Sequence, residues 1–168
     1  MLAGCASAGG SQSRDLDLKE LCTEEQVFQY ADFEWGTDSE QLFKQSSLTF
    51  DEKDLGQGDE SSTKTYESKE KFSLENAESN MDLEFSDGQL SQVSFTFDIE
   101  QDANTWIQKE VDELNSLYGG GIATGLGNQI YQWQGEQDTV LQLTAFTEGD
   151  ESATVILSVA SMEYSIGS

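Results

Sequence analysis

The sequence lacks histidine and proline altogether, and its 168 residues include only eight lysines and arginines against 33 aspartates and glutamates. Without histidine, the serine–histidine and cysteine–histidine nucleophile pairs, histidine general bases and most transition-metal sites are excluded. Without proline, cis-proline turns and proline-rich recognition segments are excluded. The chain also has no glycine-rich phosphate loop ending in lysine and no run of 18 apolar residues, so no membrane-spanning helix is predicted.

The charge imbalance gives a net charge of −25, and no basic residue follows Lys109 although nine acidic residues do. Such a surface repels phosphate backbones and anionic lipid headgroups, so nucleic acid is not expected as a partner. The simplest interpretation is that the charge keeps an exported domain soluble and monomeric. A more specific interpretation is that the acidic surface attracts cations or a basic partner.

Residues 2–5 read Leu-Ala-Gly-Cys. This segment resembles a lipobox, the signal of bacterial lipoproteins in which the cysteine becomes the lipidated first residue of the mature protein. The resemblance makes Cys5 the expected lipid-attachment residue and predicts an extracytoplasmic protein anchored to the bacterial cell membrane. The basic and apolar regions of a signal peptide are expected upstream of Met1. The Ser/Gly/Ala-rich residues that follow Cys5 favour a flexible tether, so we assign residues 1–20 to lipobox and tether.

The second cysteine, Cys22, is expected to be a thiol packed in the core. A Cys5–Cys22 disulfide fits an oxidising compartment but is incompatible with a thioether at Cys5. Residues 21–161 are expected to form one domain, followed by a polar tail at 162–168.

Alternating hydrophobic residues predict a strand over 26–35, although the capping-box pattern at 23–26 leaves a helix open there. Thr37 and Glu40 predict the start of a short helix that ends near Gln45. Residues 51–71 are charged and glycine-containing and are expected to be the least structured part of the body. An EF-hand is rejected because Lys53 and Leu55 stand at ligand positions, so no metal site is assigned.

The sheet pattern is clearest over 81–97, where Asp87-Gly88 between two alternating runs predicts a hairpin. An amphipathic helix is predicted over 103–118, ending at three glycines. Three more strands are expected at 129–134, 139–147 and 152–160. The predicted fold class is α+β: a curved antiparallel sheet with helices packed on one face. The stretches 23–98 and 103–161 each have a helix followed by a meander, which suggests two degenerate halves.

The runs FEWGTDSEQL at 33–42 and FSDGQL at 85–90 resemble the strand–glycine–helix entry and the hairpin of small bacterial envelope lipoproteins. These have a β-lactamase-inhibitor-protein-like or outer-membrane-assembly-lipoprotein-like domain. The resemblance implies a protein that binds other proteins or scaffolds envelope complexes, with no catalytic residues and no cofactor.

The function expected is therefore a non-catalytic binding or scaffolding module with a protein partner in the cell envelope. Tyr118, Tyr131 and Trp133 lie around the glycine-rich stretch and are the candidate partner-binding residues, with core packing as the alternative. Two other functions stay open. One is weak calcium binding by residues 51–60 or 148–151, and the other is a hydrolase that uses two carboxylates.

Overall fold

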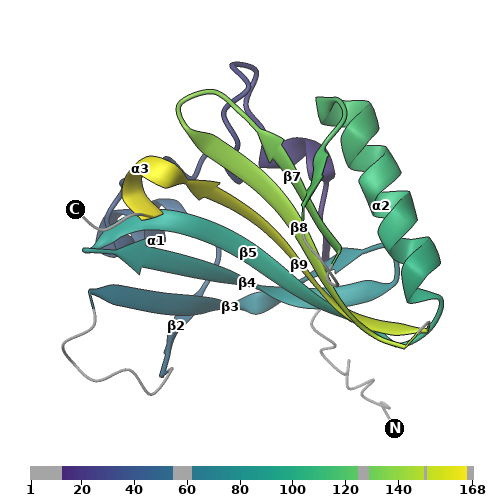
Figure 1. Cartoon of the computed structure of the whole chain (residues 1–168). Helices are drawn as coiled ribbons and strands as arrows, with labels where there is room; N and C mark the ends of the chain where they lie inside the picture. Colours follow the sequence, from purple (N-terminus) through teal and green to yellow (C-terminus); the bar gives the residue numbers. More distant parts are fainter. Residues whose placement is uncertain (1–12, 55–61, 125–128, 150, 166–168) are drawn as a thin grey trace, which may run out of the picture.

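The computed structural model describes residues 13–54, 62–124, 129–149 and 151–165. Their strands form one sheet in the order β1-β3-β4-β5-β9-β8-β7-β6, and β2 also pairs with β3 (Figure 1). Among the strands that the structure describes, only β1 pairs in parallel, with β3. The strands are β1 (Arg14–Asp15), β2 (Phe50–Lys53), β3 (Thr63–Leu74), β4 (Ala77–Ser86), β5 (Gln89–Ile99), β6 (Ile122–Thr124), β7 (Gln129–Gln134), β8 (Thr139–Glu148) and β9 (Ser152–Ser161).

The helices are few and mostly short. They are the 3₁₀ helix η1 (Leu18–Leu21), α1 (Ser39–Gln45), α2 (Ala103–Tyr118) and α3 (Met162–Ser165). The described part of the chain is thus a strand-rich, mostly antiparallel sheet with a small helical component, and Figure 1 shows the sheet curved. Within the described residues, no helix combines the length and the apolar character needed to cross a membrane.

The predicted hairpin between β4 and β5 is confirmed. Asp87 and Gly88 connect the strands with φ angles of 49° and 81°, the left-handed conformation that a two-residue type I′ turn requires at both positions. Met81, Leu83 and Phe85 on β4 are fully buried, while the alternating Asp82 and Glu84 face the other side of the sheet.

Helix α2 and the three strands of the second meander also form where the sequence predicts them. Gly119 ends α2 with φ 86° and ψ 178°, a backbone conformation that is essentially restricted to glycine. At the other end, the Asp102 side chain makes no capping hydrogen bond. The last strand of each meander, β5 and β9, pair with each other from Gln92–Ala160 to Ile99–Ala153, which joins the two meanders into one sheet.

The expectation that residues 51–71 are the least structured part of the domain is wrong for the residues of this range that the structure describes, because most of them lie in β2 and β3. Strand β3 begins at Thr63 and pairs with both β2 and β4. Its charged residues do not disfavour the strand because they pair across it. Lys53 of β2 lies 3.1 Å from Glu67, and Lys64 lies 3.3 Å from Glu52. Residues 55–61 lie outside the described ranges.

The tether predicted for residues 1–20 extends too far into the domain. From Arg14 onward the chain belongs to the fold, because β1 pairs with β3 and Leu16 and Leu18 are buried in the core. The lipobox and Cys5 lie outside the described residues. At the other end, part of the predicted tail folds as α3, where the Ser165 hydroxyl donates to the Ser91 carbonyl at 3.2 Å.

The strand predicted over 26–35 is wrong, and so is the alternative helix. Residues 22–35 form an irregular loop in which only Cys22 and Phe28 make an isolated bridge. Helix α1 does form, but Asp38 rather than Thr37 caps it, and its carboxylate accepts from the Gln41 N–H at 2.9 Å.

The core lies on one face of the sheet. Phe72, Phe95 and Leu157 represent the inward rows of β3, β5 and β9, and each is at most 2% exposed. Helix α2 and the segment 16–35 contribute buried side chains to the same core, for example Ile107 and Phe28. The loop 22–35 therefore covers part of the sheet that α2 does not cover.

Candidate functional site

The loop 22–35 is anchored to the turn between β7 and β8. The Phe28 N–H donates to the Thr139 hydroxyl at 2.9 Å, and the Glu136 N–H donates to the Gln26 carbonyl at 2.8 Å. Gly135 permits this contact, since a Cβ there would lie 2.6 Å from the Gln26 oxygen. These bonds join residues more than a hundred positions apart, so the loop is part of the tertiary structure and not a free connection.

The loop also has an unusual backbone. Gln26 and Ala31 have φ angles of 63° and 46°, in a region that residues other than glycine rarely adopt. A tight turn accounts for the first, because the Gln26 N–H donates to the Thr23 carbonyl and the Thr23 hydroxyl accepts from the Val27 N–H. Such strain persists only where surrounding contacts hold it, and it is common at binding sites.

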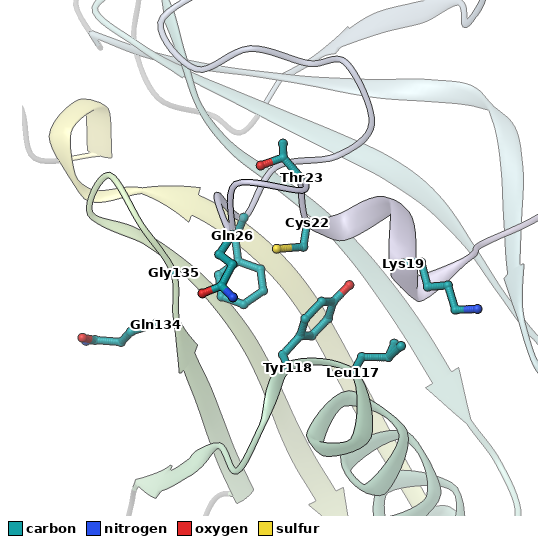
Figure 2. A pocket seen from close by; sticks show the side chains of 9 residues that line it. Lys19, Cys22, Thr23, Gln26, Leu117, Tyr118, Gln134 and Gly135 are labelled. Atoms are coloured by element: carbon teal, nitrogen blue, oxygen red, sulfur yellow. The ribbon is translucent and has the colours of Figure 1, made fainter.

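One hollow lies between the loop, the end of α2 and the end of β7 (Figure 2). We call it the thiol pocket, and it has a volume of about 320 Å³. Its lining residues are Lys19, Cys22, Thr23, Gln26, Phe28, Leu117, Tyr118, Gln134 and Gly135.

Two polar groups of the thiol pocket, those of Cys22 and Tyr118, have pKa values above their usual ranges. Burial raises the pKa of the Cys22 thiol, which keeps the sulfur protonated and weakly nucleophilic. The Tyr118 hydroxyl donates to the Leu18 carbonyl, and burial, with the nearby Cys22 and Asp17, raises its pKa. Figure 2 shows Cys22 and Tyr118 close to each other and Lys19 extending to the side. The prediction that the Cys22 thiol packs in the core is correct only in part, since it is half-buried at a pocket wall.

A second hollow lies on the other side of the same loop, between the loop and α3. We call it the acidic groove, and it has a volume of about 560 Å³. It is lined by Thr23, Glu24, Glu25, Val27, Gln29, Glu34, Trp35, Gln137, Ser161, Glu163 and Tyr164. Four of these residues are glutamates, and none is basic.

Contacts with neighbouring residues hold the two aromatic rings of the acidic groove in place. The Trp35 indole N–H donates to the Phe28 carbonyl at 2.9 Å. The Tyr164 ring packs on Gly36, where a Cβ would lie 2.7 Å from the ring. Gly36 has φ 77°, so both its backbone conformation and this close contact require glycine.

The three aromatic residues that the sequence suggests for partner binding do not form one surface. Trp133 is only 3% exposed, and its indole N–H donates to Asn115 Oδ1 at 3.1 Å and to the Gly119 carbonyl at 3.0 Å. It is therefore a core residue, which corrects that part of the prediction. Tyr131 is half-buried on the core face of β7, and Tyr118 lines the thiol pocket. For these two residues, partner binding stays a prediction.

The residues of the acidic groove were missed because no local motif joins them. They come from the loop 22–35, from the turn after β7 and from the end of β9 with α3. The only sequence signal was compositional, namely the large acidic excess, and it does not say which carboxylates gather. Within the described ranges, no three acidic or sulfur-bearing side chains are grouped so that they could hold a metal ion.

Comparison with known proteins identifies no relative of the chain. No protein-family model, no curated protein and no solved structure matches the chain. The resemblance to small envelope lipoproteins therefore stays a prediction. The features of the structure that bear on function are the two hollows and the loop between them.

Proposed function

We propose that the chain is an extracytoplasmic lipoprotein anchored to the bacterial membrane through Cys5. We further propose that its folded part is a non-catalytic module that binds a protein partner in the cell envelope. The observation that carries the binding role is the loop 22–35. It is irregular, partly exposed and held rigid by hydrogen bonds to a distant turn, and it separates two hollows. Loops positioned by a rigid scaffold are the usual place for binding residues.

The non-catalytic part of the proposal is supported by the state of the potential reactive groups. The raised thiol pKa of Cys22 disfavours the thiolate that nucleophilic catalysis needs. The sequence supplies no histidine that could act as its base. A binding role uses the same pocket for shape and hydrogen bonding and needs no activated group.

We also propose that the domain consists of two degenerate helix-plus-meander halves. The order α1, then β3–β5, and the order α2, then β7–β9, support this proposal. The antiparallel pairing of β5 with β9, the last strand of each meander, also supports this proposal, because a two-fold repeat would pair these strands in this way. An α+β lipoprotein domain of the resembled family is the finer fold assignment that this arrangement favours.

The lipid anchor is tested by mass spectrometry of the product of the full gene, extracted from membranes of its native host. We expect a mature chain that starts at Cys5 and carries acyl chains, and we expect Cys5→Ser to release the protein from the membrane. A soluble product with an unmodified Cys5 would refute the anchoring.

The binding role is tested with a photo-crosslinking amino acid placed at Gln29 or Gln134, one position for each hollow. Gln108, exposed on α2, is the control position because it lines neither hollow. We expect a discrete adduct from a loop-side position in whole cells and none from Gln108. Equal adducts from all three positions, or none from any, would contradict a partner at this loop.

A further inference from the structure

Two neighbouring side chains of α2 carry buried polar atoms that have no partner in the described part of the chain. These atoms are the indole nitrogen of Trp106 and both carboxyl oxygens of Glu110, and no other buried side-chain nitrogen or oxygen of the described residues lacks a hydrogen bond. The two residues stand about one helical turn apart on the same face of α2. Such groups are rare in native proteins, and here they concentrate in one contact between the helix and the sheet.

The surface under α2 is apolar. The helix packs on β8 and β9 (Figure 1), and the centre of its Trp106 ring lies 5.9 Å from that of Phe97 on β5. The inward rows of these three strands consist of hydrophobic side chains, with Phe97, Leu143 and Val155 as examples. Glu110 is 1% exposed against this surface. The described residues of these inward rows therefore present no titratable or charged side chain to its carboxyl.

The charged groups that act on the Glu110 carboxyl come from the β3–β4 turn and from α2 itself. They are Glu75 at that turn, and Lys109 and Glu113 on the helix. The two acids repel a carboxylate, and the exposed Lys109 already pairs with Glu75 at 2.6 Å. Burial, followed by Glu113 and Glu75, raises the pKa of Glu110 from 4.5 to about 7. An ionised Glu110 is thus uncompensated while α2 lies on the sheet.

The two ends of α2 are held in different ways. At the C-terminal end, the Tyr118 hydroxyl donates to the Leu18 carbonyl, which ties the last turn to η1. At the N-terminal end, Asp102 has φ 52°, a conformation that non-glycine residues rarely adopt, and its side chain makes no capping bond. The Ala103 N–H donates there to the Glu151 carbonyl at 3.0 Å. The end nearer to Trp106 and Glu110 therefore lacks the side-chain anchor that holds the other end.

We infer that α2 is a pH-operated flap, closed on the sheet while the Glu110 carboxyl is protonated and released at its N-terminal end when this carboxyl ionises. This property is separate from the partner-binding role proposed above. A carboxylate buried without a counter-charge is far more costly than the neutral acid. Release of the first turns of α2 gives water to both the carboxylate and the Trp106 indole, while the C-terminal anchor keeps the helix attached.

The direction and size of the effect follow from proton linkage. The closed position binds the Glu110 proton more tightly than the open one, so closure is most favoured at low pH and is weakened as the pH rises through about 7. With a pKa of about 7 when closed and its ordinary value when open, the equilibrium constant for opening rises by roughly 30- to 100-fold from about pH 5 to about pH 8.

Hydrogen exchange of the whole chain tests the flap, with mass spectrometry at about pH 5 and about pH 8 and correction for the intrinsic exchange rate at each pH. We expect the protection of residues 103–110 to fall by roughly 30- to 100-fold over this range. The protection of β5 should fall by less than about threefold, because its pairing with β4 and β9 stays intact when only the flap opens.

Matched variants assign the effect to Glu110. Glu110→Gln keeps the shape of the side chain but cannot ionise, so residues 103–110 should have the same protection at both pH values. The exposed Glu113→Gln removes the same charge from the same helix and should keep most of the pH-dependent loss. If circular dichroism shows that Glu110→Gln is not folded, Glu110→Met makes the comparison without a buried polar group.

Three results would overturn the inference. Unchanged protection of residues 103–110 would mean that α2 does not open. An equal loss of protection in β5 would mean that the whole domain unfolds and not the flap. A loss that persists in the Glu110 variants would assign the pH dependence to another group.

Discussion

At the scale of single residues, the buried carboxyl of Glu110 is the clearest source of pH dependence. It lies on α2, is 1% exposed, and neither carboxyl oxygen has a hydrogen-bond partner among the described residues. Burial, followed by the like charges of Glu113 and Glu75, raises its pKa from 4.5 to about 7, and Lys109 opposes this only in part. The folded state therefore favours the protonated acid.

Because of this raised pKa, the contribution of Glu110 to the free energy of unfolding is most favourable at low pH. It falls as the pH rises from about 4.5 to about 7. Glu110→Met, which removes the buried charge at similar volume, should raise the free energy of unfolding by about 2–3 kcal/mol at about pH 8 and by much less at about pH 5. Urea unfolding at the two pH values measures this difference. The exposed Glu113→Gln on the same helix is the control, and an equal gain from both variants at about pH 8 would contradict the role of burial.

Gly36 is the second residue whose environment makes a sharp prediction. Gly36→Ala combines an unfavourable φ of 77° with a Cβ 2.7 Å from the Tyr164 ring. Gly88→Ala has a similar φ of 81° but no atom within 4 Å of its Cβ, so it carries the backbone strain alone. We expect a loss of about 1 kcal/mol for Gly88→Ala and about 2–3 kcal/mol for Gly36→Ala. Thermal unfolding measures both, and equal losses would show that Tyr164 is not packed on Gly36.

At the scale of elements, Asn115 fastens the end of α2 to the edge of the sheet. Its Oδ1 accepts from the Trp133 indole N–H at 3.1 Å and from the Gly121 N–H at 2.8 Å. One side chain thereby holds β7 and the segment leading to β6 against the helix. The contact also explains why Trp133, a candidate partner-binding residue with core packing as the alternative, lies in the core.

Asn115→Ala should destabilise the domain by about 1–3 kcal/mol, because it leaves the half-buried Gly121 N–H without its acceptor. Hydrogen exchange should speed up most in β6 and in the last turn of α2. Gln108→Ala on the same helix removes only an exposed bond to Asp112 and should cost a few tenths of a kcal/mol. Unchanged exchange in β6 would show that Asn115 does not fasten this edge.

At the scale of the whole molecule, the net charge of −25 sets the response to salt. Mutual repulsion opposes the compact state, and screening lengths fall from about 30 Å at 0.01 M salt to about 10 Å at 0.1 M. Raising NaCl over this range should therefore increase the thermal midpoint. CaCl₂ at equal ionic strength should give the same shift, whereas a larger shift with calcium would favour the alternative function of cation binding.

The sequence by itself determined those elements whose defining pattern lies among residues that are close together in the chain. The β4–β5 hairpin follows from period-two alternation around Asp87-Gly88, and α2 follows from its apolar stripe and terminal glycines. The second meander was placed within one residue at each strand end. Helix α1 was found as well, although its cap is Asp38.

Only the tertiary structure decided the rest, because the deciding contacts join distant residues. Val27 and Phe28 are both buried, which breaks the alternation of a strand, and the Thr139 hydroxyl satisfies the Phe28 N–H in place of a neighbouring strand. Strand β3 pairs with β2 and β4, and its lysines and glutamates form cross-strand ion pairs with β2, and no single segment of the sequence reveals these contacts. The acidic groove likewise exists only because the pairing of β9 with β5 and β8 brings residues 161–164 beside residues 24–35.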